Sequence, residues 1–428
     1  MKFSNTQFEI DKTKSEAKLI KKESPTKSLG LSDKILYFRD DFRLKFITTF
    51  LPKDFPNSVG SGYWLFTKYQ FLSNVAGTVT GVLSMQSLLF AVGLGNGSIP
   101  MAAALNWIIK DGLGQLGGVI YASRMGGKFD SEPKRHRFIS SVVMQISYLM
   151  EVFSPLVPHL FLPLASVSNI FKNVSWLANS ATRAPMNQSF ALHNNLGDIT
   201  GKSGSQSTAA AVIGTAIGVG VSSLTGGELV KVFVAFIPFC YLSLYWTYLS
   251  NNAVITKNLN HQRMEIILSN YFEKYLQNPI HDQPLIDSIK LLTPKQVSYN
   301  ETFVFPFKTS NKYEIVVNSN IKHFITNDDE LVRKLKQTLS NLDHYLVYVK
   351  NSKIYLWYID TPSSNHILQG YYHASWINYR LTQNPLINAN ELEFSVEKFE
   401  CFYDKLTQIG WDTNHLHLSK VKYNLKTI

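Results

Sequence analysis

Long apolar runs dominate the first 250 residues of the chain. The stretch 71–94 carries no charged residue and is long enough for one membrane span, which needs roughly 20 apolar residues. A second stretch, 99–121, is interrupted only by Lys110 and Asp111. The pattern predicts a hairpin of two membrane-crossing helices at this position. Two further apolar runs follow, at 207–224 and 229–249.

The apolar stretch 138–171 contains three prolines, of which the first is Pro155. Proline removes a backbone hydrogen bond and clashes with the preceding turn, so it breaks or kinks a helix. Two shapes fit the stretch: one long kinked span, or two shorter helices that fold back at Pro155 with Glu151 near the turn. The fold-back is favoured. The polar segment after it, 172–206, is interpreted as a loop on the same side of the membrane.

After residue 250 the apolar runs give way to alternating polar and apolar positions. Leucines at three- and four-residue spacing predict a helix over 331–342. Alternating residues predict a hairpin of two strands, 345–349 and 354–359, around Asn351. The chain therefore divides into three predicted parts: a disordered basic tail at 1–29, a membrane helical domain at 30–250 and a soluble α+β domain at 251–428.

The balance of charges agrees with a membrane protein. Charged residues make up 17% of the chain, whereas soluble domains contain roughly 25%. The net charge of +11 favours contact with anionic lipid. The basic loop at 124–137 and the basic tail are expected on one membrane face, as the positive-inside rule requires. Because the basic residues flank apolar spans, we expect no nucleic-acid partner. Two cysteines exclude a disulfide framework and a cysteine metal cluster.

Charged side chains within apolar runs are the candidate functional residues. An ionisable pair such as Lys110 and Asp111 is costly in a membrane, so it should face protein or a water-filled cavity. Two interpretations stay open for the pair: a structural ion pair, or part of a ligand or ion pathway. Arg183 offers a planar fork suited to carboxylate or phosphate. The predicted ligand-binding residues, which would close over one cavity, are Lys110, Asp111, Arg183, His193, Asn194, Asn195, Asp198 and Lys202.

The alternative for the later part of this set is an ordinary capped and hydrogen-bonded loop. His193 has no second histidine or cysteine nearby, so no metal site is predicted.

Two glycine motifs invite a nucleotide-binding interpretation that their context does not support. Gly112 to Gly117 matches G-x-G-x-x-G, but a helical run rather than a strand precedes it, which favours helix packing. Gly201-Lys202-Ser203 resembles the end of a phosphate loop, but the first glycine of that pattern would fall at Leu196. The sequence presents no pair of nucleophile and base and identifies no cofactor, so an enzyme is the weakest of the functional classes.

Three short pieces of the segment from Ala102 to Gln206 form one recognisable set: Trp-Ile-Ile-Lys-Asp-Gly at 107–112, Ala-Thr-Arg-Ala at 181–184, and the residues His193, Asn194, Asn195, Asp198, Lys202, Ser205 and Gln206. In these pieces the segment resembles the root UVB-sensitive protein family, and the resemblance extends over roughly residues 55–249. It implies a membrane-associated protein, and plant members of the family are tied to root responses to UV-B and to vitamin B6 balance. The family carries over no catalytic residues.

Together these patterns predict a mainly α protein: a polytopic membrane-embedded helical bundle with a smaller C-terminal α+β domain. The predicted function is transport or homeostasis of a small anionic metabolite. The alternative is a membrane scaffold that recruits partners through its C-terminal domain. Expected partners are membrane lipid, the metabolite, and a family paralogue or a second copy of the chain. The expected location is a membrane crossed several times, in an organelle that the sequence does not indicate.

Overall fold

The computed structural model describes residues 45, 47–92, 101–125, 128–277, 289–307, 312–321, 329–340, 343–359, 361–387 and 395–418. The chain forms two compact units, Met1–Lys53 and Asp54–Ile428, and every element below belongs to the second. The expected disordered tail, 1–29, lies outside the described residues. The domain boundaries expected near residues 29 and 250 stay predictions.

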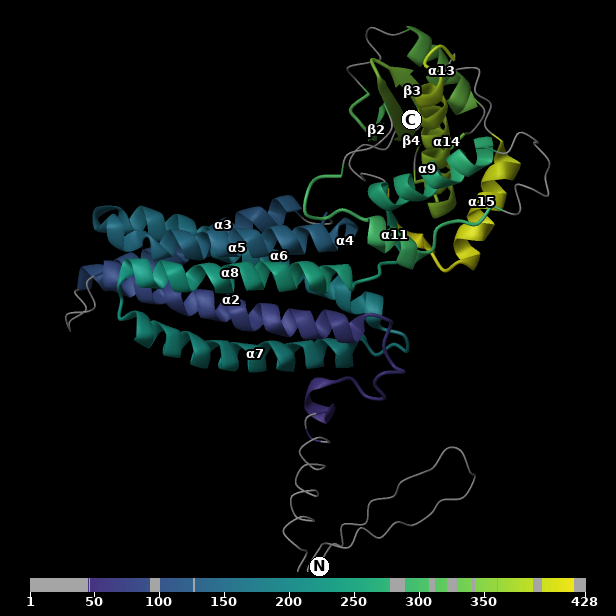
Figure 1. Ribbon diagram of the computed structural model, residues 1–428. Helices are drawn as coiled ribbons and strands as arrows, with labels where there is room; N and C mark the ends of the chain where they lie inside the picture. The colour runs from purple at the N-terminus through teal and green to yellow at the C-terminus, as the bar shows by residue number, and fades with distance from the viewer. Residues whose placement is uncertain are drawn as a thin grey trace, which may run out of the picture. The chain divides into compact units, whose positions relative to one another are not determined.

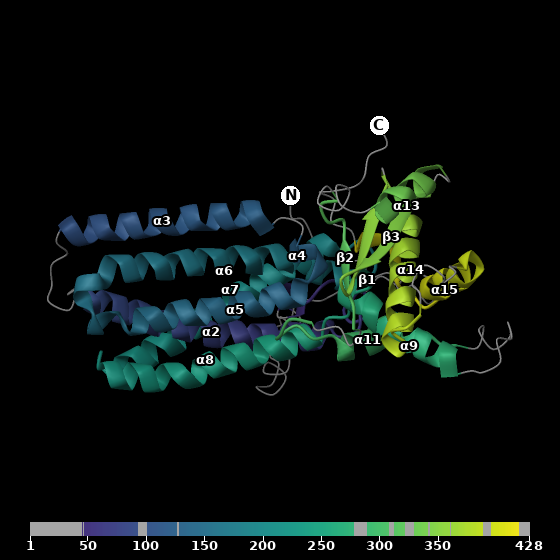
Figure 2. The ribbon, with the colours of Figure 1, turned by 90° about the horizontal axis from the view of Figure 1, so that it is seen from above.

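Six long helices build the first part of this unit, and Figures 1 and 2 show them running alongside one another. α2 packs against α5, α7 and α8, and α6 packs against α3 and α5. The six helices are α2 (Tyr63–Ala91), α3 (Met101–Met125), α5 (Pro133–Val152), α6 (Phe161–Phe190), α7 (Leu196–Thr225) and α8 (Leu229–Asn252). The short helices among them are α4 (Lys128–Ser131), η2 (Ser154–Leu156) and η3 (Pro158–Leu160).

The predicted fold-back at Pro155 is confirmed. α5 ends at Val152, and two short 3-10 turns follow, each with a proline at its first or second position. α6 then returns along α5 from Phe161. The predicted polar loop at 172–206 is wrong, because α6 continues to Phe190 and α7 begins at Leu196. The polar residues of this segment are divided between the two helices and their connection: Ser175, Thr182 and Asn187 are buried, whereas Ser180, Gln188 and Ser205 are exposed.

Glycines set how closely the helices approach. A Cβ atom at Gly214 or Gly218 of α7 would overlap α2 at Thr78 and Val82 respectively. A Cβ atom at Gly117 of α3 would lie 2.6 Å from Ile170 of α6. The G-x-G-x-x-G motif thus lies inside a helix and serves helix packing, as its context predicted.

The second part is an α+β arrangement in which α14 packs against a three-stranded sheet of order β2-β4-β3. β3 and β4 form the predicted antiparallel hairpin, and Asn351 and Ser352 adopt positive φ angles of 51° and 58° at its turn. β1 and β5 pair in parallel as a second small sheet. The elements are β1 (Asn258–Asn260), α9 (His261–Gln277), α11 (Pro294–Asn300), β2 (Glu314–Val317), α13 (Asp329–Ser340), β3 (Tyr345–Lys350), β4 (Lys353–Tyr358), α14 (Ser364–Gln383), α15 (Val396–Gln408) and β5 (Asp412–His417).

The described part of the chain is therefore mainly helical with a few short strands. Within it, three helices are long and apolar enough to cross a membrane: Pro133–Leu156, Leu196–Thr225 and Leu229–Asn252. α2 and α3, which occupy the places of the first two expected spans, are not among them. α2 is less apolar because it buries hydroxyl side chains such as Ser73, Thr80 and Ser84 on the faces that meet other helices.

Candidate ligand-binding cavity

A polar cavity of about 640 Å³ lies among the helices of the first part. Most of its lining comes from α2, α5 and α6, and α7 and α8 add Ser207 and Ser243. This volume falls within the range of small-molecule sites, roughly 300 to 1,000 Å³.

Helical periodicity explains why these helices turn polar side chains toward one space. Residues three and four positions apart share one face of a helix, so a stripe at this spacing lines one side of a cavity. The stripes comprise Gln70, Ser73, Asn74 and Gly77 on α2, Arg137, Ser141, Gln145, Tyr148 and Glu151 on α5, and Lys172, Trp176, Asn179 and Arg183 on α6.

Two arginines meet at one end of the cavity. The side chain of Arg137 is buried, its Nε donates to Gln70 Oε1 at 3.2 Å, and its Nη1 donates to the Asn179 carbonyl at 3.4 Å. The positive charge of Arg183 also acts on the Arg137 guanidinium. Among the described residues, no carboxylate forms an ion pair with either arginine. An unpaired buried cation is costly, so this end is suited to a bound anion.

A carboxylate and a lysine occupy the other end. Glu151 is 1% exposed, and its Oε1 lies 2.5 Å from Lys172 Nζ. Ser84 and Ser168 donate hydrogen bonds to the same carboxylate from α2 and α6. Glu151 lies about four helical turns beyond Arg137 on α5, or roughly 20 Å at 1.5 Å per residue. The cavity is thus elongated, with cations at both ends and an anion at one.

Neutral polar groups line the space between the two ends. Gln145 Nε2 lies 3.3 Å from Ser243 Oγ, and Ser73 Oγ lies 2.7 Å from Thr247 Oγ1. The Oε1 atom of Gln145 is buried and has no hydrogen-bond partner among the described residues. Gln145 can therefore accept a hydrogen bond from a bound molecule.

Lys110 and Asp111 lie elsewhere, where α3 meets α6. Lys110 Nζ is 3.1 Å from Asp111 Oδ1 and 4.1 Å from the centre of the Trp107 ring. Asn169 Nδ2 donates to the Lys110 carbonyl and to Asp111 Oδ1, at 3.1 Å each. Since Asn169 precedes Arg183 by about four turns of α6, or roughly 20 Å, the structure does not bring this pair to the arginine end.

The other predicted residues cluster where α6 leads into α7. His193 and Asn194 are exposed, and Asn194 has a positive φ of 54°. Asn195 precedes the first residue of α7, and its Nδ2 donates to the Ser58 carbonyl at 2.8 Å. Asp198 is in the first turn of α7, where a negative charge stabilises the helix, and Lys202 follows one turn later. Of the eight predicted ligand-binding residues, Arg183 alone is among those that line the cavity.

The sequence interpretation missed most of the cavity. It placed Arg137 in a basic loop and Lys172 at the start of a polar loop, and it noted Glu151 only as a residue near a turn. The signal was present as polar residues at three- and four-residue spacing within apolar runs. This spacing predicts a polar helix face only once α5 and α6 are both known to be helices.

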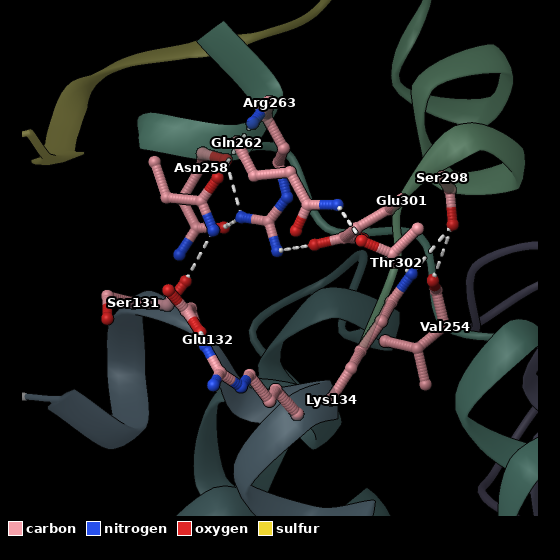
Figure 3. A network of polar contacts seen from close by, with 12 residues as sticks. Ser131, Glu132, Lys134, Val254, Asn258, Gln262, Arg263, Ser298, Glu301 and Thr302 are labelled. Carbon is pink, nitrogen blue, oxygen red and sulfur yellow. Dashed lines mark hydrogen bonds and ion pairs between the residues drawn. The ribbon is translucent and has the colours of Figure 1, made fainter. Parts of the chain in front are cut away.

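A second buried charge cluster joins α5 to the α+β part (Figure 3). Lys134 Nζ lies 2.8 Å from Glu301 Oε2, and Arg263 Nη2 lies 2.7 Å from Glu301 Oε1. Burial alone would raise the pKa of Glu301, but the charges of Arg263 and Lys134 outweigh it and hold the pKa below its usual range. Ser298 Oγ and the Asn258 carbonyl accept further bonds from Lys134 and Arg263.

Comparisons with known proteins agree with the resemblance found in the sequence. Residues 39–275 match the family model described as the vitamin B6 photo-protection and homoeostasis domain. The chain is 26% identical to Protein root UVB sensitive 3 of Arabidopsis thaliana over 86% of its own length and 83% of that protein's.

Two other relatives match a shorter region. RUS family member 1 of Dictyostelium discoideum is 32% identical, over 60% of this chain and 47% of the relative. Protein root UVB sensitive 2, chloroplastic, of Arabidopsis thaliana is 32% identical, over 61% of this chain and 57% of the relative. No solved structure matches the chain. The family model covers more than half of the sequence, and the chain therefore belongs to the root UVB-sensitive family.

Proposed function

We propose that this protein is a membrane carrier for a small anionic metabolite, and that the metabolite binds in the cavity between α2, α5 and α6. The observation that carries the proposal is the pair of arginines, Arg137 and Arg183, which share one end of a cavity without a carboxylate partner among the described residues. Guanidinium groups form paired hydrogen bonds with phosphate and carboxylate oxygens. An anion bound there would supply the negative charge that no described carboxylate provides to the two arginines.

The distribution of polarity supports a membrane location. Only 22% of the most apolar window of α7 and 17% of that of α8 are buried. Large apolar side chains such as Val212, Leu224 and Val230 are exposed on these helices. Charged side chains line the interior instead. Soluble proteins rarely expose apolar surfaces of this extent, whereas lipid would cover them.

The description of the matched family supplies the candidate ligand. It names vitamin B6, and the phosphorylated vitamers combine an aromatic ring with a phosphate ester. The arginine end suits the phosphate, and Trp176, which lines the cavity and is 69% exposed, offers a ring for stacking. The probe that this chemistry selects is pyridoxal phosphate.

The test is uptake of labelled pyridoxal phosphate by proteoliposomes that contain the full-length chain. We expect saturable uptake by the wild type and at least a tenfold loss in Arg137→Gln and Arg183→Gln, since each variant removes about 1.5 to 3 kcal/mol of charged hydrogen bonding. Arg135→Gln is the matched control, because Arg135 pairs with Glu132 and neither residue lines the cavity. Absence of uptake by the wild type would overturn the proposal. Wild-type activity in both cavity variants would show that the two arginines do not bind the transported anion.

A further inference from the structure

Glu151 is the only carboxylate among the residues that line the cavity, and its surroundings fit two protonation states. We propose that Glu151 takes up a proton when an anion reaches Lys172, so that the protein carries anion and proton together. This inference rests on the proposed function and adds the ion that is coupled to it.

In the ionised state both oxygens of the Glu151 carboxylate have partners. The Ser84 hydroxyl donates to Oε2, the Ser168 hydroxyl donates to Oε1 at 2.7 Å, and the Lys172 ammonium lies 2.5 Å from Oε1. The groups that the structure places next to the Glu151 carboxylate are the Lys172 ammonium and the Ser168 hydroxyl from α6, the Tyr148 phenol from α5 and the Ser84 hydroxyl from α2. Lys172 supplies the positive charge among them.

The surroundings of Glu151 also offer hydrogen-bond partners to the protonated carboxyl group. A hydroxyl has one hydrogen, so Ser168 can donate either to Glu151 or to the Ser147 carbonyl, which lies 3.1 Å away. When Glu151 carries a proton, its O–H can donate to Ser168 Oγ while Ser168 donates to Ser147. Ser84 continues to donate to Oε2. A purely structural ion pair would need only the ionised arrangement.

The position of Lys172 allows its ammonium group to move away from Glu151. Its side chain is 22% exposed and lines the cavity, whereas that of Glu151 is 1% exposed. The flexible lysine stem allows the ammonium to turn toward an anion that arrives from the arginine end. A buried carboxylate that loses its cation is strongly destabilised. A proton from the solvent on the side where the anion enters then binds one Glu151 oxygen, and it returns to the solvent when the anion leaves and Lys172 pairs with the carboxylate again.

The experiment uses proteoliposomes with the full-length chain, a pH one unit lower outside than inside, and a membrane potential clamped at zero. If one proton accompanies each anion, the wild type should concentrate pyridoxal phosphate about tenfold inside, since one pH unit corresponds to a factor of ten. Glu151→Gln should equilibrate the probe without concentrating it. The steady-state ratio is the readout because it does not depend on transport speed. Glu228→Gln, which alters an exposed ion pair with Lys231, should behave as the wild type.

A second variant guards against a folding failure of the first. Ser168→Ala removes the group that accepts from protonated Glu151 but leaves Glu151, Ser84 and Lys172 in place, so it should slow the approach to the tenfold ratio without changing the ratio itself. Tenfold accumulation in Glu151→Gln, or an unchanged rate of accumulation in Ser168→Ala, would overturn the inference. So would exchange by the wild type without accumulation, which would leave the proposed function standing. Absence of any exchange by the wild type would overturn both.

Discussion

Replacing Glu301 by glutamine tests the buried charge cluster directly. The side chains of Lys134 and Arg263 are 2% and 1% exposed, and both share the Glu301 carboxylate. Removing one partner of a buried ion pair costs about 3 to 5 kcal/mol, because the remaining charge stays buried without compensation. The amide of glutamine keeps the shape and part of the hydrogen bonding, so we expect Glu301→Gln to lower the free energy of unfolding by about 3 kcal/mol, at the lower end of that range.

The assay is denaturant unfolding of the full-length chain in detergent, followed by tryptophan fluorescence. Glu314→Gln is the control, because Glu314 forms an exposed pair with Lys353 and such pairs contribute about 1 kcal/mol or less. The pKa of Glu301 is lower in the folded state than in the unfolded chain, so its stabilising effect is present above the unfolded pKa and is lost as pH falls through the folded one. The difference between variant and wild type should therefore shrink in acid. A loss below about 1 kcal/mol at neutral pH would refute the reasoning.

Three further predictions follow from packing, burial and surface polarity. Gly214→Leu should lower stability by about 1 to 3 kcal/mol, because the leucine side chain would overlap α2. Gly201→Ala is the control and should change stability little, because no atom lies within 4 Å of the added Cβ. Thermal unfolding of the two variants and the wild type measures the difference. Burial, aided by the charge of Lys334, lowers the pKa of His373 to about 4. The folded state therefore binds fewer protons than the unfolded chain between pH 4 and the usual histidine pKa, so the stability of the protein falls as pH falls through this window. Melting temperatures measured across this pH range should fall less in His373→Gln than in the wild type. Identical melting-temperature curves for the two proteins would contradict the assignment. The protein should stay with membranes on carbonate extraction, and release into the soluble fraction would contradict a membrane location.

The sequence predicted the elements whose signals are local. Pro155 and the prolines after it mark the fold-back because proline is incompatible with a continuing helix whatever its surroundings. The β3–β4 hairpin was likewise visible, because alternating apolar residues flank a turn at Asn351. These features depend on neighbours in the chain, so one sequence suffices to find them.

The cavity depends on which helices lie together, and the sequence does not contain that information in a local form. Lys172 and Glu151 are 21 positions apart, and their proximity follows from the return of α6 along α5. The polarity of 172–190 was taken as the mark of a loop, but a buried helix face around a polar cavity has the same composition. Arg183 was identified because its chemistry is distinctive, and its true neighbour, Arg137, was not.

The start of α2 and the end of α8 lie next to each other. Gly62, just before α2, has a positive φ of 94°, and a Cβ atom there would collide with the carbonyl of Ala253, which directly follows α8. A bilayer around these helices would leave the segment before α2 and the chain after α8 on one face. The α+β part would then fold on the side where the segment before α2 already lies, and the translocation machinery would not have to move it across the membrane.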